Sequence, residues 1–365
     1  MKKICHITSA HRRYDPRIFQ KECRSLAKEG YHVYLLVNDK MPCEKKDGVK
    51  IVPTGFSSQN RIKRFFLSHK KILKRAIAIN ADIYHFHDPD LLLLGLRLKK
   101  RGKKVIFDSH ENVREDIKDK EYLPKVVRNL ISWAYVLIET YVLKRIDAVI
   151  GVTPQQMVLL NKMGNKTALV TNYPEYKETD NKRYLEKNGI CFAGTIFDIW
   201  SHETILDILD KVDVKYKLCG IVEDSYLETL KKHRNWCFVE YRGVLDYDKV
   251  GEFLGSSIAG MALLKQTQNV GSQGTMGNTK IFEYMKAGIP VIMADFPLWK
   301  NIVNKYGCGI CVNIKDKKEI IKAIRYIIDH PDKAIEMGEN GRKAYKEEYN
   351  WETQVGALLD LYKKL

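Results

Sequence analysis

A lysine and a glutamate, Lys280 and Glu283, stand three residues apart within residues 277–297, GNTKIFEYMKAGIPVIMADFP. Apolar residues recur there at helical spacing, which predicts a short helix over 279–287. Asn278 or Thr279 is a suitable N-cap, because a side-chain oxygen there can accept a backbone N–H hydrogen bond. The free amides and the dipole of a helix N-terminus attract anions, and Lys280 adds a formal positive charge. Glu283 lies one turn further on, where a carboxylate can accept both hydroxyls of a ribose.

These features suit a site for a nucleoside diphosphate. A plain helix-to-strand connection with a solvated lysine and glutamate would explain them equally well. A glycine-rich loop precedes the helix. Gly288 fits the position after its last turn, and Pro290 prevents it from continuing. Residues 290–294 are then apolar, as expected of a parallel strand that is covered on both faces. The residues by themselves leave both interpretations open.

Strands and helices alternate along both halves of the chain, which predicts two doubly wound α/β domains. In the second half, a strand over 189–193 ends in Gly194 and Thr195, a turn where a backbone can approach phosphates. Another strand over 257–264 places Lys265 at its carboxyl end, beside the predicted anion site. At 365 residues, the chain is long enough for two substantial cores.

Polar residues also follow the strands expected in the first half. His11, Asp15 and Arg17 come after a strand over 1–10, His87 ends a strand over 82–87, and His110 and Glu111 follow a strand over 103–107. The carboxyl ends of parallel strands are where such sheets bind ligands, so we expect a functional edge here. A solvated loop remains the alternative for residues 11–17. The triplet Asp88-Pro89-Asp90 opens a helix, and we expect it to cap that helix rather than to hold a metal.

The run Asn278-x-Lys280-x-x-Glu283-Tyr-Met-x-x-Gly288-x-Pro290-Val resembles the donor-binding signature of retaining GT-B glycosyltransferases, the GT4-like group of bacterial surface-polysaccharide synthesis. The first half is similar to the same group in His6-x-Thr, Tyr14-Asp-Pro-Arg17-Ile-Phe, His85-Phe-His87-Asp88-Pro and Asp108-x-His110-Glu111. The resemblance covers nearly the whole chain. It implies two Rossmann-like domains facing a cleft: residues 1–172, a linker over 173–188, residues 189–348, and a helix over 349–365 that returns to the first domain.

The resemblance also implies roles for individual residues. Glu283 would hold the ribose, and the phosphates would lie against the helix N-terminus. One departure is Thr275, where the family often has a second glutamate, and another is the absence of the usual basic residues after Gly194, for which Lys265 and Arg242 are the expected substitutes. The implied catalytic residues are His110, Lys280 and Glu283. The implied donor-binding residues are Gly194, Thr195, Arg242, Lys265, Thr275, Met276, Gly277, Asn278, Thr279, Lys280 and Glu283, and the acceptor-binding residues are His11, Asp15, Arg17, His87 and Glu111.

The implied activity transfers a hexose-type sugar from a nucleoside-diphosphate donor to a lipid-linked or saccharide acceptor, with retention, in capsule, O-antigen or exopolysaccharide assembly. We expect no cofactor and no metal, since the lone Cys308-x-x-Cys311 pair has no partner pair. One alternative is a nucleotide-sugar 2-epimerase of the same architecture, which would need no second substrate. Another is a non-catalytic nucleic-acid binder. The latter is suggested by charge alone, and no nucleic-acid-binding motif supports it.

The whole net charge of +17 falls within residues 1–172, which indicates an anionic partner for the first half. A basic amphipathic helix is predicted over 61–79, and we expect it to dock on the anionic inner face of the cell membrane. Its docking residues would be Lys63, Arg64, Phe65, Phe66, Lys70, Lys71 and Lys74. The apolar run 122–138 is interpreted as a core helix, with a surface for a lipid-linked acceptor as the alternative. Scattered cysteines indicate a reducing cytoplasm.

Overall fold

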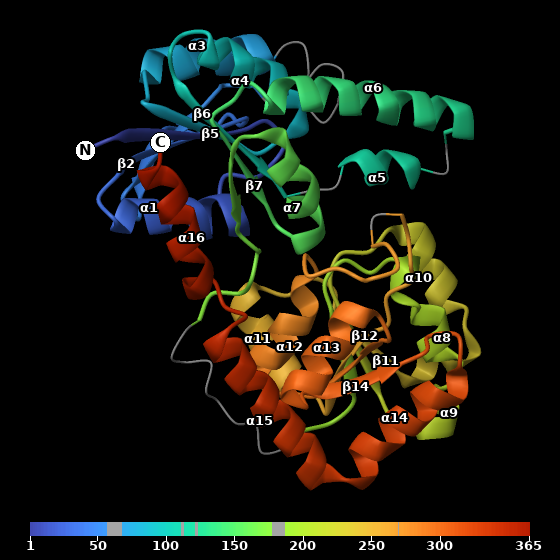
Figure 1. Cartoon of the computed structure of the whole chain (residues 1–365). Helices are drawn as coiled ribbons and strands as arrows, with labels where there is room; N and C mark the ends of the chain where they lie inside the picture. The colour runs from blue at the N-terminus through green and yellow to red at the C-terminus, as the bar shows by residue number, and fades with distance from the viewer. Residues whose placement is uncertain (57–67, 111–112, 121–122, 177–186, 269) are drawn as a thin grey trace. The chain divides into compact units, whose positions relative to one another are not determined.

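The structure is a computed structural model that describes residues 1–56, 68–110, 113–120, 123–176, 187–268 and 270–365 (Figure 1). The chain divides into two compact units. Unit 1 contains Met1–Asn172 and Gln354–Leu365, and unit 2 contains Tyr173–Thr353. Each unit is an α/β Rossmann-like domain built on its own sheet.

Unit 1 is built on an eight-stranded sheet in the order β3-β4-β2-β1-β5-β6-β7-β8. All neighbours are parallel except β3 and β4, and the chain reverses its direction of winding between β1 and β5. Such a reversal is where doubly wound sheets bind ligands, beyond the carboxyl ends of the strands. The strands are β1 (Lys3–Thr8), β2 (His32–Val37), β3 (Glu44–Lys46), β4 (Val49–Pro53), β5 (Ile83–Phe86), β6 (Lys104–Ser109), β7 (Ala148–Gly151) and β8 (Lys166–Leu169).

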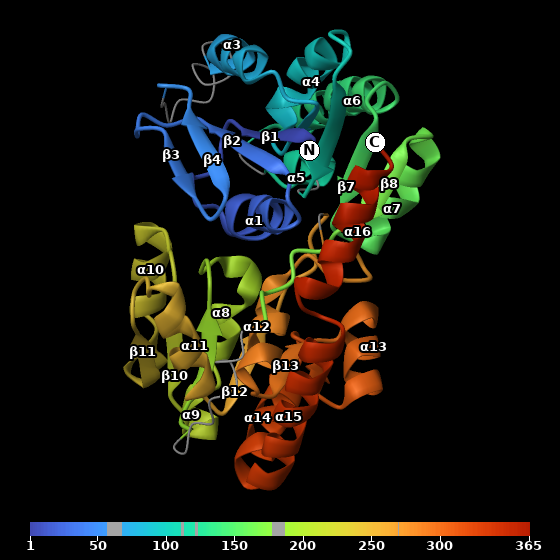
Figure 2. The ribbon, with the colours of Figure 1, turned by 90° about the vertical axis from the view of Figure 1, so that its left-hand side faces the viewer.

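Helices cover both faces of this sheet. Figures 1 and 2 show α3, α4 and α6 on one face, with α1, α7 and α16 on the other. A π-helical segment, η1, carries the chain from the end of β1 into α1. The helices are η1 (Pro16–Cys23), α1 (Arg24–Lys28), α3 (His69–Ile79), η3 (Pro89–Leu91), α4 (Leu92–Lys99), α5 (Val113–Lys118), α6 (Lys125–Leu143), α7 (Pro154–Leu160), η4 (Asn161–Met163) and α16 (Glu352–Lys363).

Unit 2 is built on a six-stranded, all-parallel sheet in the order β11-β10-β9-β12-β13-β14, and its winding reverses between β9 and β12. The strands are β9 (Ile190–Ala193), β10 (Tyr216–Cys219), β11 (Val239–Tyr241), β12 (Ala259–Ala262), β13 (Val291–Ala294) and β14 (Gly309–Val312). The helices are η6 (Asp198–Trp200), α8 (His202–Leu206), α9 (Leu209–Val212), α10 (Asp224–Lys231), η7 (Arg234–Phe238), α11 (Tyr247–Gly255), α12 (Thr279–Ala287), α13 (Pro297–Tyr306), α14 (Lys317–Asp329) and α15 (Pro331–Glu347).

The helix α6 does not lie in the core, and the interpretation of this run as a core helix is wrong. Many of its large apolar side chains are exposed, because only one side of the helix packs on α4 and α5. Among the described helices, α6 is long and apolar enough to cross a membrane by length and composition, with 22% of its most apolar window buried. The exposed side chains are Val126, Val127, Leu130, Ile131, Trp133, Leu137, Ile138 and Tyr141.

One further expectation for unit 1 differs from the structure, and another falls partly on its described residues. Asp88 does not cap the helix that follows it; its carboxylate instead accepts hydrogen bonds from the Thr8 hydroxyl (2.7 Å) and the Ser9 amide (2.6 Å) at the end of β1. The basic helix is described from His69 onward as α3, with Lys70, Lys71 and Lys74 exposed and its apolar side buried. Lys63, Arg64, Phe65 and Phe66 lie outside the described residues.

Candidate active site

The helix α12 begins and ends where the sequence predicts. Asn278 is its N-cap, with the side-chain Oδ1 accepting a hydrogen bond from the Lys280 amide at 3.1 Å. Gly288 ends it in the left-handed conformation, at φ 68°. The N-terminus follows the loop that leaves the carboxyl end of β12, the strand beside the winding reversal. Its backbone amides are therefore presented at the edge of the sheet where ligands bind.

The side chain of Lys280 extends from the first turn of α12 across two aromatic rings. Its Nζ lies 4.4 Å from the centre of the Trp200 ring and 5.3 Å from that of Phe192, distances at which an ammonium is attracted to an aromatic face. Burial lowers the pKa of Lys280 to about 8. No ion pair with a carboxylate is found for it among the described residues, so its charge is available to a bound anion.

Two glycines make room for this lysine. A Cβ at Gly194 would lie 2.6 Å from Lys280 Cε and 2.9 Å from Nζ, and a Cβ at Gly220 would lie 1.8 Å from the Gly194 carbonyl oxygen. The φ angles are 134° at Gly194 and 138° at Gly220, a backbone conformation that residues other than glycine rarely adopt. The ends of β9 and β10 therefore approach each other closely beneath Lys280.

A pocket of about 280 Å³ lies above these two strand ends. Lys280 and Glu283 line it from α12, and Gly194 and Thr195 line it from the end of β9. The pocket thus combines a cation and a carboxylate one turn apart with glycine backbone. The other lining residues are Ala193, Cys219, Gly220, Ile221, Val244, Leu245, Val250, Leu254, Thr279 and Tyr284.

A second cation lies near the first. Lys265 has Asp198 as an ion-pair partner, with Nζ 3.5 Å from Oδ2. Burial, and then the charges of Lys280 and Lys265, lower the pKa of His202 to about 3. Both lysines therefore place positive potential on the same region of unit 2. No role was assigned to His202 or Trp200 from the sequence. The one local signal is that Trp200 lies just before the start of the helix α8, which begins at His202.

The remaining expected donor residues lie outside this pocket. Arg242 is exposed and paired with Glu240. In the loop before α12, the Thr275 hydroxyl accepts a hydrogen bond from the Gly277 amide (3.0 Å), and the Thr275 carbonyl oxygen accepts one from the Trp299 indole (2.8 Å). Met276 packs partly against the core of unit 2. These contacts order the loop that leads into the helix N-terminus.

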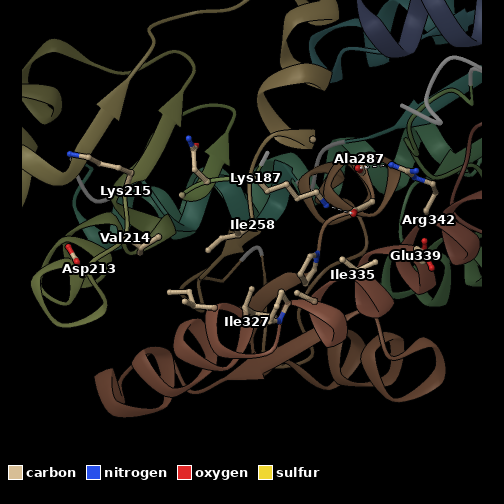
Figure 3. A pocket seen from close by; sticks show the side chains of 18 residues that line it. Lys187, Asp213, Val214, Lys215, Ile258, Ala287, Ile327, Ile335, Glu339 and Arg342 are labelled. Atoms are coloured by element: carbon tan, nitrogen blue, oxygen red, sulfur yellow. Dashed lines mark hydrogen bonds between the residues drawn. The ribbon is translucent and has the colours of Figure 1, made fainter. Parts of the chain in front are cut away.

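A larger cavity of about 800 Å³ lies at the opposite end of the same sheet. Figure 3 shows Lys187, Lys215 and Ile258 around it, beside the amino ends of β9, β10 and β12. It is remote from the carboxyl ends of these strands, and it contains neither Lys280 nor Glu283. Size alone therefore does not identify the functional pocket of unit 2.

In unit 1, two histidines lie between two carboxylates at the carboxyl edge of the sheet. His11 Nδ1 is 3.0 Å from Asp15, His11 Nε2 is 3.1 Å from His110 Nε2, and His110 Nδ1 is 3.4 Å from Asp108. Three hydrogen bonds across four ring nitrogens need three N–H groups, whereas two neutral imidazoles supply two. Two neutral imidazoles can therefore make two of these three contacts as hydrogen bonds at any one time.

Both flanking carboxylates are held in the ionised form. Burial alone would raise the pKa of Asp15, but hydrogen bonds from His11 and from two backbone amides lower it to about 2. Burial would likewise raise the pKa of Asp108. There the Arg17 guanidinium and hydrogen bonds from His110 and His87 hold it well below its usual range. The histidine pair thus lies between two negatively charged carboxylates.

Arg17 and His87 are buried, contrary to the expected contact with an acceptor. Arg17 donates two hydrogen bonds to Asp108 (2.7 and 2.9 Å) and one to the Val170 carbonyl oxygen (3.0 Å). His87 contacts Asp108 at 3.2 Å and His6 at 3.0 Å. Both side chains therefore organise the interior beneath the histidine pair. Glu111 lies outside the described residues.

Comparison with known families identifies the class of protein. Residues 17–172 match the model named Glycosyltransferase Family 4, and residues 203–360 match a Glycosyl transferase-like model. Together the two matches cover most of the chain. The chain belongs to the glycosyltransferases. No curated protein sequence matches this glycosyltransferase significantly.

Solved structures share the fold of this glycosyltransferase over its full length. A sucrose-phosphate synthase from Thermosynechococcus elongatus matches with a TM-score of 0.77 and 15% identity, covering 100% of this chain and 99% of that one. WaaG, a glycosyltransferase of lipopolysaccharide biosynthesis, matches at 0.70 and 11%, covering 98% and 99%. Anabaena HepE in complex with UDP-glucose matches at 0.68 and 12%, covering all of both chains. The two Rossmann-like domains therefore form the GT-B architecture.

Proposed function

We propose that this glycosyltransferase transfers a hexose-type sugar from a nucleoside diphosphate to a saccharide or lipid-linked acceptor, with retention of configuration. The observation that supports this proposal most directly is that Lys280 and Glu283 line one pocket at the capped N-terminus of α12. The amides and Lys280 would bind the diphosphate, and Glu283 would accept the ribose hydroxyls. UDP-glucose bound to the similar Anabaena protein supports a donor of this class.

Charge stabilisation would supply most of the catalysis. A nucleoside diphosphate leaves as an anion, and fixed cations and amides stabilise the charge that it develops in the transition state. Lys280 and Lys265 both lie close enough to His202 to lower its pKa, so both can act on the leaving diphosphate. This arrangement needs no metal ion for the transfer step, which is part of the proposal.

The histidine pair of unit 1 would serve the acceptor. His11 and His110 lie between two ionised carboxylates, and both are partly accessible, with side-chain exposures of 25% and 11%. A neutral imidazole at this position can accept a proton from an attacking hydroxyl and become an imidazolium beside an ionised carboxylate. We therefore keep His11 and Asp15 as acceptor-side residues and His110 as a catalytic residue.

The surface of unit 1 supports an acceptor held at a membrane. The exposed apolar side chains of α6 and the exposed lysines of α3 belong to helices on one face of the sheet (Figures 1 and 2). Apolar insertion combined with cationic attraction is how peripheral proteins bind anionic leaflets. We propose that the enzyme acts in the cytoplasm at the inner face of the cell membrane, in the assembly of a surface polysaccharide.

The first test is a donor screen followed by a transfer assay. Thermal shifts with UDP, GDP, dTDP and CMP identify the base, because a ligand that binds only the folded state raises Tm. The matching nucleotide sugars are then incubated with the enzyme, with and without a lipid extract that contains polyprenyl-phosphate-linked sugars. Mass spectrometry identifies a glycosylated product, and proton NMR of the new anomeric centre identifies its configuration.

The outcomes separate the proposed function from its alternative. A product formed only with acceptor, with the donor's anomeric configuration, supports a retaining transferase. Conversion of the donor into an isomeric nucleotide sugar without acceptor would instead identify an epimerase. The variant Glu283→Ala serves as the control for both reactions, since it alters the nucleotide pocket used by either enzyme.

A further inference from the structure

Four potential metal ligands meet in the interior of unit 1. His6 comes from β1, Glu22 from η1, and His85 and His87 from the end of β5. One ligand atom from each residue lies within 4.8 Å of the others, and all four side chains are buried. The β1–β5 register places His6 directly beside His85, and His87 follows two residues later on the same face.

The spacing of these atoms suits a four-coordinate ion. The Glu22 Oε2 atom lies 3.8 Å from His6 Nδ1, 3.8 Å from His85 Nδ1 and 3.9 Å from His87 Nε2. His6 Nδ1 and His87 Nε2 are 3.0 Å apart. Ligands bound tetrahedrally to zinc at about 2.0–2.1 Å lie roughly 3.3 Å from one another. To reach the distances of a zinc site, the Glu22 contacts would shorten by about half an ångström and the His6–His87 contact would lengthen by about 0.3 Å, while the remaining ligand pairs start from within 4.8 Å.

The carboxylate at the centre of this cluster is short of partners. Among the described residues, no hydrogen bond is found for either buried oxygen of Glu22, or for Nε2 of His85. The nearest cation, Arg17, lies 3.0 Å from Glu22 Oε1 but directs two hydrogen bonds to Asp108, which balances its charge. Buried charged groups are normally paired or bound to a metal, because burial without compensation is costly.

The surroundings provide the outer contacts that metal-binding histidines usually have. The second ring nitrogen of His87, Nδ1, lies 3.2 Å from the Asp108 carboxylate. The second nitrogen of His6, Nε2, lies 3.3 Å from the Tyr362 hydroxyl of α16. A carboxylate or hydroxyl bonded to the far nitrogen fixes the ring orientation and the tautomer of a ligating histidine. Two of the three histidines therefore have an outer partner. In His85 the Nδ1 atom that lies 3.8 Å from Glu22 also lies 2.8 Å from the Tyr362 hydroxyl, so binding an ion through Nδ1 would require that hydrogen bond to break.

We propose that His6, Glu22, His85 and His87 bind a divalent transition-metal ion, with zinc as the ion that three imidazoles and one carboxylate fit best. Because all four positions come from the protein and the site is buried, the ion has a structural role. It joins β1, η1 and β5 beneath the histidine pair at the strand ends. The proposal does not depend on the sugar-transfer activity, and it revises the expectation that the chain binds no metal.

The direct test measures the metal in the intact wild-type chain. The protein is purified in zinc-containing medium, dialysed and analysed by inductively coupled plasma mass spectrometry, with one zinc per chain expected. Removal with a strong chelator should lower Tm by several degrees, and added ZnCl₂ should restore it. Replacement by Co²⁺ should give the visible bands of a four-coordinate ion without the thiolate charge-transfer band that cysteine ligands would produce.

Variants locate the ion within the chain. Glu22→Gln keeps the size of the side chain, and it should reduce bound zinc well below one per chain, as should His85→Asn. The matched control is His202→Asn in unit 2. His202 is also buried, also contacts a tyrosine hydroxyl at 2.8 Å and also has an unpaired Nε2, as His85 does, but it belongs to no ligand cluster among the described residues. This control should retain one zinc.

Three results would overturn the proposal. The first is a wild-type chain without stoichiometric metal whose Tm does not respond to ZnCl₂ or chelator, which would mean that Glu22 stays protonated in the interior. The second is full zinc content in both Glu22→Gln and His85→Asn. The third is a thiolate band in the cobalt spectrum. The wild-type measurements decide the question even if a variant fails to fold.

Discussion

Lys280 packs against the backbone of Gly194, where an added Cβ would lie 2.6 Å from the lysine Cε. We therefore expect Gly194→Ala to displace the lysine and to weaken nucleoside-diphosphate binding by about tenfold or more, or about 1.4 kcal/mol. Isothermal titration calorimetry measures this. Gly251→Ala is the matched control, because a Cβ at that helical position in the same unit meets nothing within 4 Å. Equal nucleotide affinity in both variants would mean that Gly194 does not contribute to the donor site.

The lowered pKa of Lys280 predicts a pH dependence of donor binding. A lysine that loses its proton near pH 8 loses its attraction for phosphate as the pH rises through that value. The dissociation constant for the nucleotide sugar should therefore increase above about pH 8, by up to tenfold per pH unit. In Lys280→Arg the guanidinium does not titrate in this range, so the curve should become flat. If the wild-type curve runs parallel to that of the arginine variant, Lys280 does not bind the diphosphate.

Glu283 predicts discrimination against donors that lack ribose hydroxyls. If its carboxylate accepts these hydroxyls, the wild type should prefer the ribonucleotide over its 2′,3′-dideoxy analogue. Charged hydrogen bonds contribute about 1.5–3 kcal/mol, which corresponds to roughly 10- to 150-fold. Glu283→Ala should bind both nucleotides equally weakly. Competition binding checks this, and a preference that survives in the variant would assign the ribose to other residues.

Parts of this site follow directly from the sequence because local rules determine them. The bounds of α12 and its Gly288 end were predicted and are confirmed, and Asn278 is the cap of the two predicted candidates, Asn278 and Thr279. Capping and left-handed glycine depend on neighbouring residues only. The β3–β4 hairpin was not predicted, although its Asp47-Gly48 turn, with φ of 50° and 80°, is a recognised hairpin signal. That signal was present in the sequence.

Other features depend on tertiary contacts that no local pattern contains. The apolar spacing of α6 identifies a helix, but it does not say whether Trp133 meets a core or solvent, and here it is 60% exposed. The ring of Trp200 beneath Lys280 results from packing between η6 and α12. The cluster of His6, Glu22 and His85 depends on the register of β1 against β5 and on η1 packing behind them.

The buried Arg17–Asp108 pair predicts a large loss of stability when one partner is removed. Arg17→Met would leave an uncompensated carboxylate among buried side chains, and breaking such a pair costs about 3–5 kcal/mol. Arg242→Met is the control, since its pair with Glu240 is exposed and should contribute no more than about 1 kcal/mol. Urea unfolding followed by circular dichroism compares the two. Similar midpoints would mean that the Arg17 pair contributes no more than a surface pair.

The exposed face of α6 predicts binding to anionic membranes through apolar insertion. Leu130 and Trp133 are 61% and 60% exposed, so Leu130→Glu and Trp133→Glu should leave the fold intact. In co-sedimentation with phosphatidylglycerol vesicles, either variant should reduce the bound fraction strongly, because it places a carboxylate in an anionic interface. Reversing Lys70, Lys71 and Lys74 to Glu should also weaken binding, by about 1 kcal/mol per lysine, with the effect shrinking at high salt.

Ile335→Glu provides the control for these membrane experiments. Ile335 is a similarly exposed apolar residue, at 51%, but it lies on α15 of unit 2, whereas both proposed docking helices belong to unit 1. Its replacement should leave vesicle binding unchanged. If Ile335→Glu reduces binding as much as Trp133→Glu does, the effect reflects added negative charge rather than α6. If the wild type does not bind the vesicles at all, its α6 face serves another contact, and the proposal of a membrane-bound acceptor loses its structural support.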